Sequence, residues 1–220
     1  DPQVGPAIPR SSAIAVATAA PDLRPLPKSS RACAITIGLL RLAPEGTRIT
    51  SLVGRGDGGY TIEGAGISQP LAERWRDQLL EESLDVRLTV WTHGKTGASS
   101  ERRFSYTGRL KHTSPSDLVP VTPRKSTSLL RAVSSWARAS GIRSLAVEGP
   151  IQVVLNKGLS KHRQKIWGKG SQEQIAAFSE RLAEAGQLAT LSELVIVPVY
   201  RNGHQWKDAH IYAVVDVLVR

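Results

Sequence analysis

The stretch LSELVIVPVYRNGHQWKDAHIYAVVDVLVR, residues 191–220, contains two runs rich in β-branched residues on either side of a short polar segment. Asn202-Gly203 lies in that polar segment, and this dipeptide is typical of a tight hairpin turn. The stretch therefore predicts a strand, a turn and a second strand, so that the chain closes with an antiparallel pair.

A second hairpin is predicted further upstream. LDVRLTVW (84–91) alternates apolar with polar residues, and RRFSYTGRLKH (102–112) repeats this alternation after a glycine-containing turn. Further strands are expected within 32–44, 47–54 and 60–62. The segment 143–158 is expected to form two short strands around Gly149-Pro150.

Three helices are expected between these strands. Ser68 precedes LAERWRDQLLEESL, and Ser126 is the expected N-cap of a helix that ends at Gly141. Ser171 and Gln174 have capping-box spacing at the start of the third helix, residues 171–186.

Strands in runs, instead of strict strand and helix alternation, predict a mainly β chain with inserted helices. The preferred form is an antiparallel β-sandwich of the jelly-roll kind, and an α+β arrangement is the alternative. Residues 1–31 contain six prolines and no apolar period, so we expect an extended or disordered N-terminal arm. Residues 32–220 are expected to form a single domain, and no internal repeat is visible in the sequence.

The formal charge of +10 is concentrated in one third of the chain. Residues 101–170 contain fourteen Lys or Arg side chains and three acidic ones, so this block carries the whole excess. A positive field of this kind favours polyanions, with nucleic acid first. No apolar run reaches the length of a membrane span, so a membrane partner is not expected.

The most basic stretch is LSKHRQKIWGKGSQEQ, residues 159–174, which we interpret as a loop before the third helix. Its cations can neutralise phosphates, and its tryptophan can stack on a base. The sequence therefore predicts an RNA-binding surface made of this stretch and the basic strand near residue 105. The predicted contacts are Arg102, Arg103, Arg109, Lys111, Lys157, Lys161, Arg163, Lys165, Trp167 and Lys169.

Catalytic and metal-binding patterns are weaker. The glycines near residue 168 do not complete a P-loop, and His204 and His210 have no cysteine or helical partner for zinc. The enzymatic alternative is a ribonuclease. Its general acid, general base and cation would come from His112 or His162 with Lys161, Arg163 and Glu148. We expect no enzyme activity, no catalytic residue and no metal or other cofactor.

The proline-rich arm, the helices between strands and the closing strands of residues 191–220 resemble the jelly-roll coat proteins of bromovirus-like and ourmiavirus-like plant RNA viruses. The pattern covers about residues 170–220, and the arm departs from it because it lacks a dense arginine tract. The resemblance implies a coat or nucleocapsid protein that binds single-stranded genomic RNA, self-assembles as a homo-oligomer and resides in the virion or host cytoplasm. A basic subunit of a ribonucleoprotein, such as an organellar ribosome, is the other alternative.

Overall fold

The structure is a computed structural model that describes residues 36–93, 101–111, 118–155, 158–200 and 207–220. Its eight strands are β1 (Arg48–Arg55), β2 (Gly59–Ala65), β3 (Ser83–His93), β4 (Glu101–Leu110), β5 (Arg143–Val154), β6 (Ser160–Gly170), β7 (Thr190–Val199) and β8 (Asp208–Val219). The helices are α2 (Gln69–Glu82), α3 (Pro123–Ala139) and α4 (Gln172–Glu184), with short 3-10 turns η1 (Leu40–Leu42) and η2 (Gly186–Leu188). Residues 36–39 are helical and continue into η1. The predicted arm and the Asn202-Gly203 turn lie outside the described residues.

All eight strands belong to one sheet in the order β3-β4-β2-β1-β7-β8-β6-β5. Every neighbouring pair is antiparallel. The strands form four hairpins of consecutive strands, which include both hairpins predicted from the sequence. The expectation of a mainly β chain with inserted helices is therefore confirmed. A sandwich of two sheets is not confirmed. Among the described residues, helices and not a second sheet pack on this sheet, as in the α+β alternative.

The elements form two units with the same topology. Residues 36–110 and 123–219 each run helix, hairpin, helix, hairpin along the chain. Within each unit the third strand is followed across the sheet by the fourth, the second and the first. The first strand of unit one, β1, pairs with the third strand of unit two, β7, and we call this contact the unit joint. The fold is thus internally repeated, although the sequence shows no repeat.

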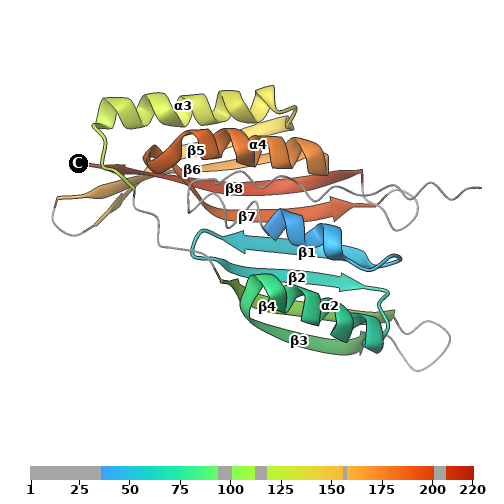
Figure 1. Cartoon of the computed structure of the whole chain (residues 1–220). Helices are drawn as coiled ribbons and strands as arrows, with labels where there is room; N and C mark the ends of the chain where they lie inside the picture. Colours follow the sequence, from blue (N-terminus) through green and yellow to red (C-terminus); the bar gives the residue numbers. More distant parts are fainter. Residues whose placement is uncertain (1–35, 94–100, 112–117, 156–157, 201–206) are drawn as a thin grey trace, which may run out of the picture.

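The helices cover one face of the sheet (Figure 1). Directly paired residues of neighbouring strands share a face, and Tyr106, Ile62, Leu52 and Ile196 form one such buried row. Tyr106 on β4 donates a hydrogen bond from its hydroxyl to the carbonyl of Ala72 on α2 at 2.7 Å, which fixes this row on the helix side. No described helix packs on the other face, which we call the open face.

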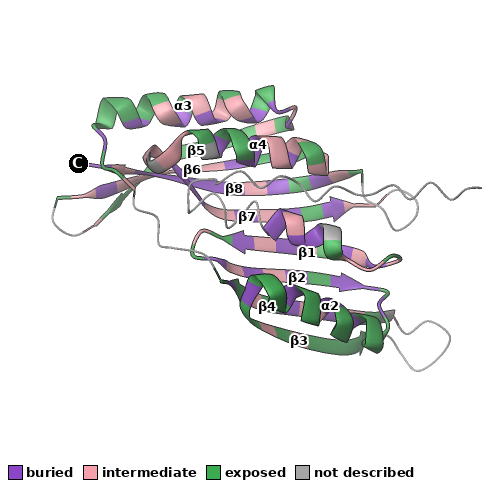
Figure 2. Cartoon of the chain, viewed as in Figure 1, coloured by how far each residue is buried: buried purple, intermediate pink, exposed green. Residues whose placement is uncertain are grey.

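The core lies between the helices and the sheet. Trp75 of α2 packs edge-on against Tyr106, with ring centroids 4.9 Å apart, and Phe104 completes this aromatic group. At the other end Ile175, Phe178 and Leu182 of α4 are fully buried, as the apolar spacing of this helix predicts. In Figure 2 the edge strand β3 is exposed along most of its length, whereas the central strands are largely buried.

Three local predictions were wrong. Residues 36–42 are helical instead of extended, because a short apolar run has no period that separates a buried helix from a strand. Residues 143–154 form one strand, whose pairing with β6 shifts between Glu148 and Ile151. Helix α3 begins at Pro123 with Thr122 as its N-cap, and Ser126 is buried inside it.

Candidate nucleic-acid interface

Within the basic stretch 159–174, residues 160–170 form strand β6 and not a loop, and α4 begins at Gln172. Side chains alternate between the faces of a strand, so its basic residues at every second position reach the open face together. The positions between them face the helices, but only one of the four, Ile166, is a large apolar residue. Gly168 is one of these, and a Cβ there would lie 2.4 Å from the Ile142 side chain. The residues that β6 places on the open face are Lys161, Arg163, Lys165, Trp167 and Lys169.

Three of these cations are paired with carboxylates. Arg163 donates from Nε and Nη2 to the two carboxylate oxygens of Asp216 on β8, at 2.8 and 3.0 Å. Asp216 is 1% exposed, and Lys161 Nζ lies 4.0 Å from the same carboxylate. Lys165 Nζ lies 3.1 Å from a carboxylate oxygen of Glu148 on β5. The hydrogen bonds with Asp216 raise the pKa of Arg163, so this side chain stays charged over any practical pH range.

Lys169 is the most available cation of the strand. It is exposed, forms no ion pair with a residue in the described part of the chain, and lies beside His210 of β8. Arg143 lies opposite Lys169 on β5 and bonds to Asp208. The open face around β6 therefore presents five cations against the carboxylates of Glu148, Asp208, Asp216 and, on β7, Glu193, so it keeps one excess positive charge.

An aromatic pair lies among these charges. Trp167 and Tyr212 occupy directly paired positions of β6 and β8, with ring centroids 5.3 Å apart and planes tilted by 43°. Trp167 is 36% exposed. Exposed rings within a positive surface can stack on bases of any identity, as single-strand binding surfaces do. Sequence reasoning missed Tyr212 and His210, although both lie in phase with the alternation of β8.

The predicted contacts near residue 105 divide between the two faces. Arg103 and Arg109 of β4 lie on the open face, and Arg109 forms a 3.2 Å ion pair with Asp57. Arg102 lies on the helix side, so alternation separates it from its neighbour. Lys111 follows β4 and donates from Nζ to the Glu81 carbonyl at 2.7 Å. Lys157 lies outside the described residues.

The two basic clusters lie on the same face without merging. Five strand-to-strand steps separate β4 from β6, which corresponds to about 24 Å at about 4.8 Å per step. Val53 of β1 and Val195 and Val197 of β7 occupy the open face between them. The open face is therefore a broad surface with basic residues near both sides and apolar ones in the middle.

His162 does not lie together with the cations and the carboxylate that the ribonuclease alternative requires. Its Nδ1 lies 3.0 Å from the Ser126 hydroxyl on the helix side. Lys161 and Arg163 project from the other face of the same strand, and Glu148 is paired with Lys165. His112 and His204 lie outside the described residues. Within the described ranges, no three His, Cys, Asp or Glu side chains are close enough to hold a metal ion.

Helix α3 carries a second positive surface that the site prediction did not include. Arg124, Lys125, Arg131 and Arg138 are exposed along this helix, which contains no acidic residue. These cations lie in the helix layer, on the opposite side of the sheet from β6's basic row. Part of the positive block therefore lies away from the open face.

Comparison of the chain with protein families, curated proteins and solved structures finds no match. Among the described residues, no helix is long and apolar enough to cross a bilayer. The fold and the site define a mainly β protein with inserted helices, whose antiparallel sheet leaves one face free of described helices and lined in part with cations and aromatic rings.

Proposed function

We propose that the protein is a non-enzymatic structural protein that binds single-stranded RNA on the open face of its sheet. The observation that carries the proposal is the row of Lys161, Arg163, Lys165 and Lys169 with the Trp167 and Tyr212 rings among them. Cations supply affinity through the release of counterions, and stacked rings hold unpaired bases.

The proposed binding is largely independent of sequence. Lys side chains act as point charges toward phosphates, and an aromatic face accepts every base. Arg163 is held by two hydrogen bonds to Asp216, so it serves more to order the surface than to grip a phosphate. Lys169 and the aromatic pair are the groups with the most freedom to contact RNA.

The most concrete form of the proposal is a viral coat or nucleocapsid protein that packages RNA and self-assembles in the virion or host cytoplasm. Non-specific affinity suits a protein that must cover a whole genome. A one-sided sheet also suits this role, because one face can contact RNA while the helix layer faces away. This form of the proposal is supported by these physical features and by the resemblance of residues 170–220 to jelly-roll coat proteins.

The test compares RNA affinity and its salt dependence in three variants. Trp167→Ala is expected to weaken binding of a single-stranded oligonucleotide by about 1–3 kcal/mol, because a stacking face is lost. Lys169→Gln is expected to reduce the slope of log affinity against log salt by about 0.7, the value for one phosphate contact on a single strand. Fluorescence anisotropy at several salt concentrations measures both quantities.

Arg131→Gln is the matched control, because it removes one exposed cation from α3 in the helix layer. It is expected to leave affinity and salt slope unchanged. Loss of affinity in Arg131→Gln together with wild-type binding in Lys169→Gln and Trp167→Ala would place the RNA on the helix layer and refute the proposed site. The recovered RNA must also remain full length, since shortened RNA would support the ribonuclease alternative.

A further inference from the structure

The two outer strands of the sheet expose apolar side chains that the interior strands bury. Seven of the thirteen large apolar side chains exposed among the described residues belong to β3 and β5. They are Leu84, Val90, Trp91, Val147, Ile151, Val153 and Val154. A long edge strand with unpaired backbone groups and apolar side chains is a template for pairing with another chain. Both edges of this sheet have that character.

The unit joint shows how such edges are paired inside the chain. Leu52 of β1 lies opposite Ile196 of β7, and both side chains are fully buried. The helical segment 36–42 lies over β1 and β7 (Figure 1), and Thr36 packs so closely on β1 that a Cβ at Gly54 would lie 3.2 Å from its hydroxyl. A first strand, a third strand and a covering helix thus complete the joint.

The same parts recur at the two ends of the sheet, where no strand in the described part of the chain pairs with them. The free strand β3 is the third strand of unit one, and the free strand β5 is the first strand of unit two. Helix α3 packs beside β5 in unit two, as the helical segment 36–42 does beside β1 in unit one. One end of the molecule therefore provides the half of the joint that the other end lacks.

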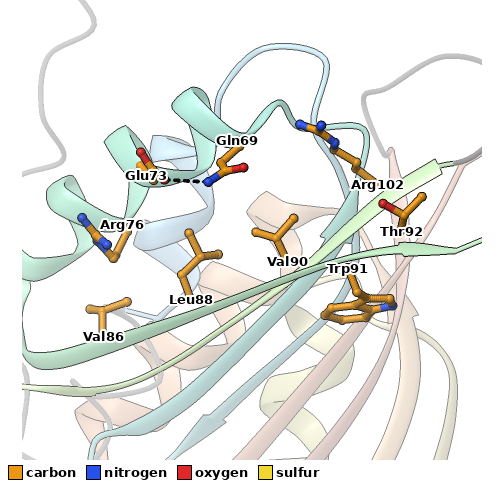
Figure 3. A pocket seen from close by; sticks show the side chains of 9 residues that line it. All are labelled: Gln69, Glu73, Arg76, Val86, Leu88, Val90, Trp91, Thr92 and Arg102. Atoms are coloured by element: carbon orange, nitrogen blue, oxygen red, sulfur yellow. Dashed lines mark hydrogen bonds between the residues drawn. The ribbon is translucent and has the colours of Figure 1, made fainter.

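An open pocket lies at β3, where the unit joint would be completed by a first strand and a covering helix. It has a volume of about 490 Å³, and Val86, Leu88 and Val90 point into it from β3 toward α2 (Figure 3). Leu194 and Ile196, the corresponding helix-side residues of β7, are fully buried within the unit joint. The pocket is thus the position that a covering helix would fill if the joint were repeated there.

The charges of the two ends are complementary. Helix α2, beside β3, contains four acidic and two basic residues, whereas α3, beside β5, contains four basic and no acidic ones. Joining β5 to β3 of another copy brings α3 close to α2. Opposite charges across such a contact favour this pairing over contacts between like ends.

From these observations we propose that a second copy of this chain pairs its β5 with β3, which extends the sheet head to tail by repeating the unit joint. The α3 helix of one copy then covers the pocket of the next. Such a heterologous contact generates a ring if it closes and a filament if it does not. The inference rests on the self-assembly part of the proposed function, and RNA binding is not required for it.

The test blocks each edge separately in protein free of RNA. Val90→Lys on β3 and Val147→Lys on β5 place a charge where the joint would bury it, at positions already more than a third exposed in the single chain. Light scattering is expected to show mass rising with concentration for the wild type and monomers for each variant. An equimolar mixture is expected to form dimers, because each variant keeps the edge that the other lacks. Val197→Lys, on the open face of the interior strand β7, is expected to assemble like the wild type.

Three outcomes would overturn the joint: a wild type that is monomeric at every concentration, either single variant assembling like the wild type, or a mixture that stays monomeric. Assembly of one variant alone would instead indicate a symmetric contact between like edges. Leu84→Lys and Val154→Lys form a second pair at still more exposed positions, and circular dichroism checks that all variants are folded. Because no RNA is present, failure of the joint leaves the RNA-binding assay unaffected.

Discussion

At the scale of single residues, the basic row of β6 contains, within the described part of the chain, paired and unpaired cations that its sequence does not distinguish. Arg163, Lys161 and Lys165 are engaged by the carboxylates of neighbouring strands, whereas Lys169 is not. Asp216 is the centre of this pairing, because its buried carboxylate accepts both hydrogen bonds of Arg163. A count of cations therefore overstates the charge available to RNA.

Removing Arg163 is expected to destabilise the fold. Arg163→Gln leaves the buried Asp216 carboxylate without its two-pronged donor, and an unsatisfied buried acceptor costs about 1–3 kcal/mol. Urea unfolding measures the change, with Lys169→Gln as a control that should alter stability by less than about 0.5 kcal/mol. Adding Asp216→Asn should recover part of the loss. Equal stabilities of Arg163→Gln and the wild type would show that the pair contributes nothing to the fold.

At the scale of elements, the start of α4 connects the basic strand to the helix layer. The backbone N–H of Ser171 donates to Gln174 Oε1 at 2.9 Å, and the N–H of Gln174 donates to the Ser171 hydroxyl at 3.3 Å. This reciprocal pair is the capping box that the sequence predicts. It fixes where β6 ends and therefore where the last residue of the basic row, Lys169, is presented.

Ser171→Ala is expected to lower the free energy of unfolding by about 0.5–2 kcal/mol, the usual cost of losing an N-cap hydroxyl. Thermal or urea unfolding measures it. Ser135→Ala, which removes an exposed hydroxyl in the middle of α3, is the matched control and should change stability by less than about 0.5 kcal/mol. A loss no larger than that of the control would contradict the structural role of the cap.

Local signals in the sequence predict elements well where side chains alternate, where β-branched runs flank a turn dipeptide, or where caps are present. The hairpins at 84–112 and 191–220 and the helix that follows Ser171 were predicted from such signals. Strand β6 was missed because its inward positions include His162, Gln164 and Gly168 instead of an apolar stripe. His162 hydrogen-bonds with Ser126 of α3, and the missing side chain of Gly168 leaves room for Ile142. The contacts of β6 arise between distant segments, and a local pattern does not reveal them.

At the scale of the whole molecule, the sheet has two distinct faces and two edges with which no described strand pairs. The open face, where we propose that RNA binds, lies opposite the helix layer, and the edges repeat the parts of the unit joint. The sequence contains the excess of positive charge but does not reveal how the cations are distributed among β6, β4 and α3. Strand order and side-chain alternation determine which face each cation reaches. The repeat was also invisible in sequence, since the two units share topology and not residues.

The most direct test of the account is photo-crosslinking of a 4-thiouridine-containing single-stranded RNA to the wild-type protein, followed by mass spectrometry of the linked peptides. We expect crosslinks concentrated in β6 and β8, at Trp167 and Tyr212, that weaken as salt is raised. Crosslinks concentrated in α3, with none on β6 or β8, would contradict the central claim that RNA lies on the open face of the sheet.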